Sequence, residues 1–398
     1  MPDRARDALI TGIGLVSCLG EGLDAHRAAL DAPGGFEPAV DSASFAPFTI
    51  HPIVPLELDR QIPKRQDQRQ MEPWQRIGTY AAGLALEAAG VKGDTALLER
   101  THMIVAAGGG ERDDAVDTAI LSALPGEADP GAYLNEHLMS DLRPTLFLAQ
   151  LSNLLAGNIS IVHGVVGSSR SFMGEEASGV DAVRIACARI AAGQGDLFLV
   201  GGSYNAQRAD ALLLLEMGRT LLRGDFAGVW SRQAAGGGMA LGSLGCFLVI
   251  ESRAHAEARS AAPLARIAAL ASDRSKRAPG DATANAQAQW ARMGAQVDAA
   301  HAAVISGASG VAAATAEERD FLATLGLPIR GATTALGHSM EAAFIANLAL
   351  AADAIRRGRL FAPLDPAGEA PMDADLTQVL VTSWGHWRGE GMALLDAA

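Results

Sequence analysis

The stretch ASGVDAVRIACARIAAGQGDLFLVGG (residues 177–202) decides the fold class of this chain. In its first part Val180, Val183, Cys187 and Ile190 recur at helical spacing, and its second part is an apolar run that ends in two glycines. A helix that leads directly into an apolar strand is the repeating unit of α/β folds. We therefore expect a helix followed by a strand that is buried on both faces.

Similar apolar runs that end at or follow a glycine occur along the rest of the chain. They are ALITGIG (8–14), MIVAAGGG (103–110), CFLVIES (246–252), AVISGASG (303–310) and QVLVTSWG (378–385). Between them, residues 74–88 and 340–355 keep the apolar spacing of a helix. Strands that alternate with helices predict an α/β fold with a mainly parallel sheet.

The order of these runs suggests two similar halves. The last two runs repeat the strand, glycine and helix order of the first half, and the composition becomes charged and alanine-rich after residue 253. We therefore expect an N-terminal half over residues 1–253 and a C-terminal half over residues 254–398. Segments 38–70 and 111–145 carry scattered proline, glycine and charge, which predicts excursions on the surface.

Composition and charge exclude several classes of function. The chain has 398 residues, of which 49% are hydrophobic, so it can bury a large core. Its net charge of −13 is opposite to that of a nucleic-acid binder, so we expect no nucleic-acid partner. We expect neither a signal peptide nor a membrane span, because residues 1–12 contain no apolar core and no later apolar run is long enough. Cys18, Cys187 and Cys246 lack disulfide or zinc spacing, which favours a cytoplasmic, reducing compartment.

Generic motifs for cofactors and metals are incomplete. Gly12-x-Gly14 follows a strand but lacks the third glycine and the acidic residue of the dinucleotide fingerprint. Residues 201–205 form only part of a nucleophile elbow. The nine histidines show no metal-ligand spacing. We therefore expect no cofactor and no bound metal.

Six blocks together resemble the β-ketoacyl-acyl carrier protein synthases, the condensing enzymes of fatty-acid and polyketide synthesis. They are ALITGIGLVSCLGEG (8–22), QRQMEPWQRIGTYAAGLALEAAG (68–90), LSNLLAGNISIVHGVVGSSRSF (151–172), residues 177–202, LGSLGCFLVIES (241–252) and TTALGHSMEAAFIANLALAADAIRRG (333–358). They span nearly the whole chain. The resemblance implies the thiolase fold, with two α/β halves in α-β-α-β-α layers and dimer-interface insertions in the first half.

The resemblance also implies a degenerate catalytic site. Condensation in this family needs a cysteine at a helix N-terminus, where the helix field favours the thiolate, and two histidines. Running the family's nucleophile segment along residues 163–179 without a gap places Glu176 at the cysteine. The matching motifs place Ser306 at the first histidine and Thr333 at the family's lysine. Glu317 matches the glutamate that pairs with this lysine, and His338 is retained as the second histidine.

Two further comparisons with the family concern the nucleophile helix and a glycine-rich loop. Cys187 lies about three turns beyond position 176 on the apolar face of the helix, so it cannot replace the missing nucleophile. The loop that commonly reads Gly-Phe-Gly-Gly-Thr-Asn begins here with Gly385, His386 and Trp387, so a histidine replaces the gating phenylalanine. The residues leave open whether Glu176 is ionised. The simpler interpretation of an acidic residue here is that it caps the first turn of the helix.

This pattern resembles the chain-length factors, which are catalytically silent partners of active synthases in type II polyketide and aryl-polyene systems. We expect a heterodimer with an active ketosynthase subunit, in which this chain limits the cavity for the growing acyl chain. The interface is expected in segment 143–173. Its candidate side chains, which could instead fill the core of this chain, are Leu146, Phe147, Leu151, Leu154, Phe172 and Met173.

An acyl carrier protein is the other expected partner, reached directly or through the synthase. Carrier proteins are acidic, and basic clusters at 60–69 and 274–277 are candidate docking sites, although ordinary solvated surface explains both. The alternatives are an active β-ketoacyl synthase or malonyl decarboxylase with an atypical site, and a protein of this fold with another ligand or scaffold role. Decarboxylation is disfavoured because it depends on both family histidines.

Overall fold

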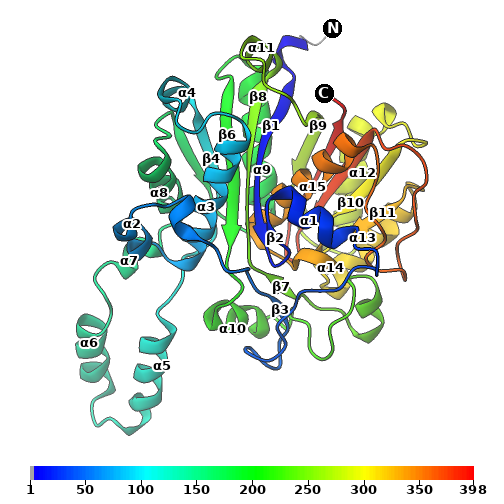
Figure 1. The fold of residues 1–398 in the computed structure, drawn as a ribbon. Helices are drawn as coiled ribbons and strands as arrows, with labels where there is room; N and C mark the ends of the chain where they lie inside the picture. Colours follow the sequence, from blue (N-terminus) through cyan, green and yellow to red (C-terminus); the bar gives the residue numbers. More distant parts are fainter. Residues whose placement is uncertain (1–3) are drawn as a thin grey trace.

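The computed structural model describes residues 4–398, and its centre is a mixed sheet of eleven strands (Figure 1). The strand order is β11-β10-β12-β13-β9-β1-β8-β6-β4-β5, and β2 pairs with β1. These strands are β1 (Ala8–Ser17), β2 (Gly20–Glu21), β4 (His102–Ala106), β5 (Ser169–Phe172), β6 (Leu197–Tyr204), β8 (Leu244–Ser252), β9 (Ala265–Asp273), β10 (Ala302–Ser306), β11 (Ile329–Gly331), β12 (Gln378–Trp384) and β13 (Glu390–Asp396). A separate parallel pair consists of β3 (Ile50–His51) and β7 (Leu241–Gly242).

The pairing pattern repeats in the two halves of the sheet. In the path β1-β8-β6-β4-β5 the first two pairs are antiparallel and the last two are parallel. The path β9-β13-β12-β10-β11 has the same sequence of pairings. This confirms the α/β fold with two similar halves, and the parallel pairs lie at the outer ends of the sheet. The division at residue 253 stays a prediction.

Helices lie between and outside the two halves of the sheet. The α-helices are α1 (Gly22–Leu30), α2 (Arg65–Gln70), α3 (Pro73–Ala88), α4 (Thr95–Arg100), α5 (Asp114–Ala123), α6 (Pro130–Ser140), α7 (Leu146–Ala149), α8 (Leu154–His163), α9 (Glu176–Ala191), α10 (Ala209–Met217), α11 (Arg253–Ala258), α12 (Asp281–Met293), α13 (Ala312–Ala323), α14 (Thr333–Leu336) and α15 (Ala343–Arg357). The 3-10 helices are η1 (Arg4–Arg6), η2 (Leu58–Arg60), η3 (Leu124–Gly126), η4 (Ser231–Ala235), η5 (Gly294–Gln296) and η6 (Met340–Ala342). Among residues 4–398, no helix is long and apolar enough to cross a membrane.

The central layer consists of α9 and α15, which pack against each other and against strands of both halves. Residues 343–355 of α15 are all buried, and their many alanines let neighbouring elements approach closely. On the outside, α3 and α8 cover the first half, and α12 and α13 cover the second. The largest apolar core therefore lies around α9 and α15, directly behind the N-terminus of α9.

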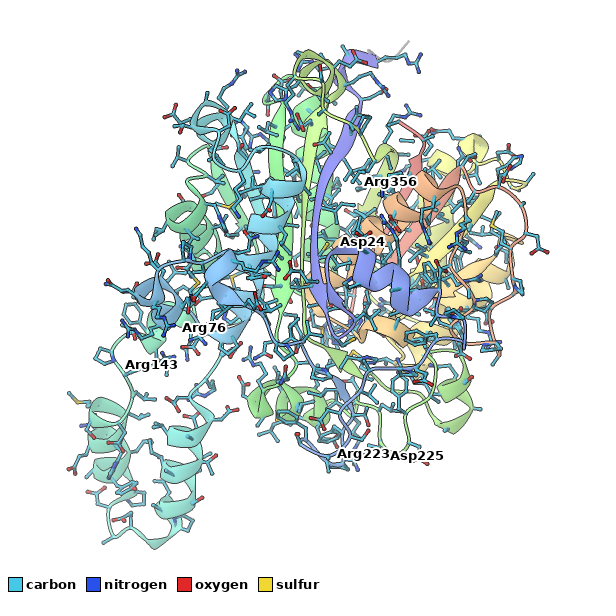
Figure 2. The ribbon with its side chains drawn as sticks, viewed as in Figure 1. Asp24, Arg76, Arg143, Arg223, Asp225 and Arg356 are labelled. Carbon is cyan, nitrogen blue, oxygen red and sulfur yellow. The ribbon has the colours of Figure 1, made fainter. Side chains whose placement is uncertain are left out.

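The surface excursion expected at 111–145 is helical. Helices α5 and α6 form an arm (residues 114–140) that projects from the body of the molecule (Figure 1). Each helix is preceded by an N-cap aspartate, Asp113 or Asp129, whose side chain accepts a hydrogen bond from a backbone nitrogen of the first turn. At the base of the arm, Arg143 forms an ion pair with Glu72 (Figure 2).

Candidate functional site

Glu176 is the first residue of α9, immediately after a sharp turn. Gly174 in this turn has φ 121°, a left-handed conformation that favours glycine. The hydroxyl of Ser178 donates to the carbonyl of Gly174 at 2.6 Å and holds the turn. Glu176 is 2% exposed, so its carboxyl group is buried at the positive end of the helix.

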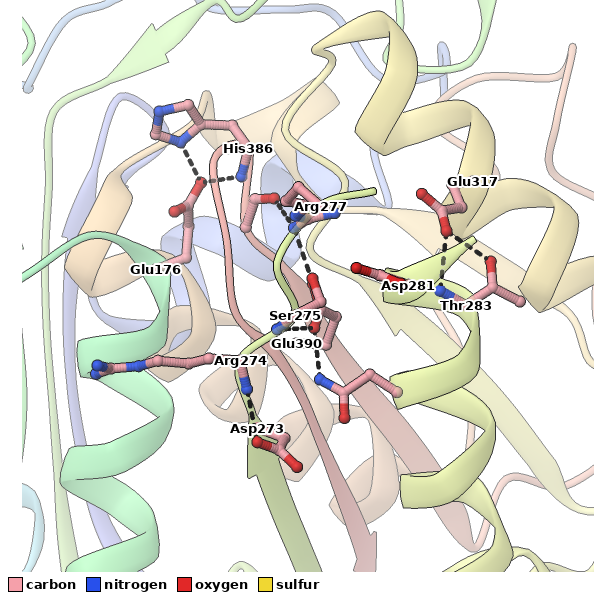
Figure 3. A network of polar contacts seen from close by, with 12 residues as sticks. Glu176, Asp273, Arg274, Ser275, Arg277, Asp281, Thr283, Glu317, His386 and Glu390 are labelled. Carbon is pink, nitrogen blue, oxygen red and sulfur yellow. Dashed lines mark hydrogen bonds and ion pairs between the residues drawn. The ribbon is translucent and has the colours of Figure 1, made fainter. Parts of the chain in front are cut away.

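One carboxylate oxygen of Glu176 receives three hydrogen bonds, of which Figure 3 shows the two from His386. Its Oε1 lies 2.9 Å from Nε2 of His338, 2.8 Å from Nδ1 of His386 and 3.0 Å from the backbone nitrogen of His386. Burial alone would raise the pKa of Glu176, but the bonds from both histidines outweigh it and hold this pKa well below its usual range. Glu176 is therefore ionised, and both imidazole nitrogens donate. Its other oxygen, Oε2, is buried without a partner.

His386 reaches this carboxylate from the hairpin between β12 and β13. The hairpin is closed by a hydrogen bond of 2.9 Å from the Gly385 nitrogen to the Gly389 carbonyl. Arg277 donates to the carbonyl of Gly385 and lies 3.0 Å from a carboxylate oxygen of Glu390. Burial lowers the pKa of His386, but the hydrogen bond to Glu176 outweighs it and raises that pKa above its usual value. Glu176 and His386 thus form a buried ion pair.

Backbone hydrogen bonds hold His338 in place, and its second ring nitrogen takes no part. Its nitrogen donates to the carbonyl of Ala240 at 2.8 Å, and its carbonyl accepts from Gly242 at 3.0 Å. A Cβ on Gly242 would lie 1.9 Å from the carbonyl oxygen of Leu336, so only glycine allows this approach. The Nδ1 of His338 is buried without a partner.

Among the described residues, neither Ser306 nor Thr333 forms a hydrogen bond with Glu176, and Ser306 belongs to a second buried group. The hydroxyls of Ser306 and Thr382 donate to Oε1 of Glu318 at 2.8 and 2.6 Å. Burial raises the pKa of Glu318 to about 7, although these hydrogen bonds oppose the shift. Thr333 donates instead to the carbonyl of Ala308 at 2.6 Å.

The structure places Glu317 away from this second group. Its Oε1 accepts from the backbone nitrogen and the hydroxyl of Thr283 at 2.9 and 3.0 Å (Figure 3). The acid beside Ser306 is the next residue, Glu318, while the match of Glu317 to the family's glutamate stays a prediction. Glu318 lies on the buried face of α13, together with Ala314 and Phe321, and this helical spacing could have identified it.

The structure adds a cavity of about 460 Å³ beside the ion pair. His386, Trp387 and Glu341 line it, together with apolar residues of α10. Glu341 is 6% exposed and was not foreseen as a site residue. Trp387 is 66% exposed, so it lies at the rim of the cavity.

The three residues Glu176, His338 and His386 could also hold a metal ion, since one ligand atom from each lies within 4.8 Å of the others. They are far apart in the sequence, and no metal spacing was visible there. In the present arrangement both imidazoles direct N–H groups at the same oxygen. A metal would therefore have to displace two protons and two hydrogen bonds.

Cys18 and Cys246 are buried thiols, and Cys187 is half-buried. Burial raises the pKa of both Cys18 and Cys187 to about 12 and also raises that of Cys246. Cys187 lies on α9 eleven residues after Glu176, which is the separation of about three turns that we expected. A thiol with such a pKa carries almost no thiolate at neutral pH.

Three of the expected interface side chains are exposed. Phe147 is 62%, Leu151 43% and Met173 66% exposed. Phe172 is partly buried against the central core, Leu154 is half-buried and Leu146 is buried. Among the basic clusters, Arg60 pairs with Glu21 and Arg274 with Asp181, while Arg277 holds the hairpin of His386.

Comparisons with known proteins give a family and a fold. The family model described as "Beta-ketoacyl synthase, N-terminal domain" matches residues 55–256. A sequence search of curated proteins finds no match. Among solved structures, the ishigamide ketosynthase/chain length factor is 20% identical with a TM-score of 0.80, and 99% of each chain is covered.

Two further solved structures are similar. A β-ketoacyl synthase from Burkholderia phymatum is 19% identical with a TM-score of 0.74, covering 98% of this chain and 99% of that one. A type II polyketide synthase acyl-carrier protein in complex with its ketosynthase, bound to the hexaketide, is 18% identical with a TM-score of 0.74. That match covers 99% of this chain and 100% of the other. At these identities the likeness shows the fold alone.

Proposed function

Because the chain belongs to the β-ketoacyl synthase family, we propose that it is a chain-length-factor-like partner of an active ketosynthase and does not condense acyl chains itself. The observation that carries this proposal is the carboxylate of Glu176, which both His338 and His386 bind at the N-terminus of α9. In the proposed correspondence, this carboxylate occupies the position of the family's nucleophilic cysteine.

The chemistry of the group supports a silent site. An acyl-accepting residue needs a free lone pair directed at the thioester carbonyl. The Oε1 of Glu176 already accepts three hydrogen bonds, and Oε2 is buried. An ionised carboxylate that is paired with a protonated imidazole is also a weaker nucleophile than a thiolate. Glu176 therefore stabilises the fold of the site rather than accepting an acyl group.

The edge of the sheet supports an interface at segment 143–173. Strand β5 is the last strand of the sheet, so one of its sides carries no strand partner among the described residues. The carbonyls of Ser168 and Phe172 accept hydrogen bonds from the β4 side, so by alternation Ser169 and Ser171 direct their backbone groups outward. An open edge of this kind is a template for pairing with a second chain.

Apolar side chains surround this edge. Ile161 lies in the last turn of α8 and is 72% exposed, and Val166 lies just after the helix and is 60% exposed. Together with the exposed side chains of Phe147, Leu151 and Met173, they make up the apolar surface that we propose for segment 143–173. A ketosynthase subunit of the same fold fits this surface, because the family resemblance places the partner contact there.

The proposal is tested by co-expressing the tagged chain with untagged candidate synthases. We expect one synthase to co-purify and condensation activity to require both chains, while intact mass shows no acyl adduct on this chain. Ile161→Glu and Val166→Glu should abolish co-purification, because each puts a charge on the apolar surface. Leu213→Glu is the matched control, since Leu213 is 63% exposed on α10 and should leave the complex intact.

Two results would overturn the proposal. One is a stable, self-sufficient homodimer that binds no synthase. The other is an isolated chain that carries an acyl group and forms carbon–carbon bonds. Glu176→Ala provides a further check, because condensation by the pair should survive this change if the carboxylate is only structural. Loss of condensation with an intact complex would assign a chemical role to Glu176.

A malonyl decarboxylase is the second candidate, and His386 favours it. The sequence offered only His338 as a family histidine, but the structure brings a second imidazole to the same carboxylate. The imidazole of His386 lines the cavity, where a malonyl thioester would lie. Release of carbon dioxide from malonyl-carrier protein by the isolated chain, and its loss in His386→Phe, would select this candidate.

A further inference from the structure

The cavity beside the ion pair has mostly apolar walls and one buried acid. Met340 and Leu215 line it, and the indoles of Trp74 and Trp387 are also part of its lining. Glu341 follows Met340 in η6 and lines the cavity, although only 6% of its surface is exposed. Such a wall fits an apolar chain.

The carboxyl group of Glu341 lacks the partners that a buried acid usually has. Its Oε2 is buried without a hydrogen-bond partner. The facing residue is Gly108, where a Cβ would lie 2.5 Å from Oε1 of Glu341, so the backbone packs closely against the acid. No ion pair of Glu341 is found among the described residues, and the nearby Arg208 is engaged by Asp210. An unpaired buried polar group costs free energy that a ligand can recover.

The surroundings of Glu341 keep it uncharged. Burial raises its pKa to about 8, and the charges of Glu176 and Glu175 add to the shift. At neutral pH the group is therefore mostly a carboxylic acid, which can donate a hydrogen bond. The same neighbouring carboxylates disfavour an anionic group in the cavity, so a neutral ligand is preferred.

We propose that this cavity binds a neutral apolar chain that bears a hydrogen-bond-accepting oxygen, such as a ketone, and that Glu341 donates to this oxygen. The inference deepens the proposed function, on which it rests, by naming the kind of chain that the cavity accepts. An oxygenated chain gains a hydrogen bond that a plain hydrocarbon cannot form. Glu341 is thus a specificity-determining residue of the cavity.

The test compares 2-octanone with octane as probes of the purified full chain. Binding is followed by the fluorescence of Trp74 and Trp387, which line the cavity. Glu341→Leu should weaken 2-octanone binding about 3- to 10-fold, the loss of one hydrogen bond, and should not weaken octane binding. Glu341→Gln should keep the affinity for 2-octanone within about 2-fold, because its amide still donates.

A second variant checks that the probes bind in this cavity. Leu215→Ala removes an apolar wall residue and should weaken both probes by the same factor. The proposal is overturned if Glu341→Leu affects both probes equally, or if the wild-type chain binds neither. Thermal unfolding of each variant confirms that it is folded. The probe-binding assay needs no synthase. If co-expression finds no partner, the proposed function is contradicted, but the measured selectivity for 2-octanone stands.

Discussion

Nδ1 of His386 lies 2.8 Å from Oε1 of Glu176, although 210 residues separate them in the chain. The carboxylate comes from the first half of the fold and the imidazole from the second. His338 also donates to this oxygen, and so does the backbone nitrogen of His386, so one carboxylate oxygen accepts three hydrogen bonds. His386 also lines the cavity, so the charged pair lies beside it.

His386→Phe should lower the free energy of unfolding by about 1–3 kcal/mol at pH 7, because a buried carboxylate loses one of its donors. Urea unfolding measures the change. Trp387→Phe is the control, since Trp387 is 66% exposed and should cost little. In a Glu176→Gln background the same substitution should cost less, because no buried charge is left unpaired. Equal costs in both backgrounds would contradict the ion pair.

Glu341→Gln should stabilise the chain at pH 8. The folded pKa of about 8 lies above the ordinary value, so the unfolded chain releases its proton first. Stability is therefore lost as the pH rises from about 4.5 to 8, on the order of 1–3 kcal/mol in all. The charged and titratable groups around Glu341 are Glu175, Glu176, Tyr204, Arg208, Asp210 and His386.

Denaturant unfolding of the wild-type chain and of Glu341→Gln, at pH 5 and at pH 8, measures this difference in stability. The advantage of Glu341→Gln should be small at pH 5, because this pH is only about half a unit above the unfolded pKa, so release of the proton in the unfolded chain costs little stability. It should be larger at pH 8. An advantage that does not change with pH would show that Glu341 titrates normally.

Glu251 should support the fold at neutral pH and cease to do so in acid. Burial alone would raise its pKa, but bonds from Arg259, His255 and Thr11 outweigh this and lower the pKa to about 2. Its contribution, on the order of 2–3 kcal/mol, is present above the unfolded pKa and is lost as the pH falls from about 4.5 to 2. Glu251→Gln should be less stable than wild type at pH 6.

The matching measurement is acid unfolding followed by circular dichroism. The difference between Glu251→Gln and wild type should shrink toward pH 2, because both side chains are then uncharged. Asp59→Asn at an exposed position serves as the control and should follow the wild-type profile. A difference that persists unchanged at pH 2 would contradict the assigned pKa.

Phe172→Ala and Met173→Ala should lengthen or broaden the products of the proposed heterodimer. Both residues lie at the end of β5, where the proposed interface meets the partner's tunnel, and truncation leaves more room for an acyl chain. Mass spectrometry of the products measures chain length. Leu213→Ala should leave the product distribution unchanged. If Phe172→Ala and Met173→Ala both give wild-type products, this chain does not set their length.

Much of the fold could be predicted from apolar runs and glycines. The six quoted runs form β1, β4, β6, β8, β10 and β12, because continuous apolar segments need burial on both faces. The strands β9 and β13 were not foreseen. Residues 265–273 are only partly buried and lie in a charged, alanine-rich region, so neither alternation nor a continuous apolar run marks them.

The site was predicted in part. The resemblance singled out Glu176, His338 and His386 one by one, but nothing in the sequence shows that one oxygen binds both imidazoles. Glu318 and Glu341 were missed because an acid in a sequence is expected at the surface. Only the tertiary structure shows that these two acids are buried.

The antiparallel pairing of β1 with β9 has a mechanical consequence. Ala8, Leu9 and Ile10 pair with Ile267, Arg266 and Ala265, so the two halves share one hydrogen-bonded ladder. A hinge between them would have to break this ladder, and opening and closing like a clam shell is therefore not available to the molecule.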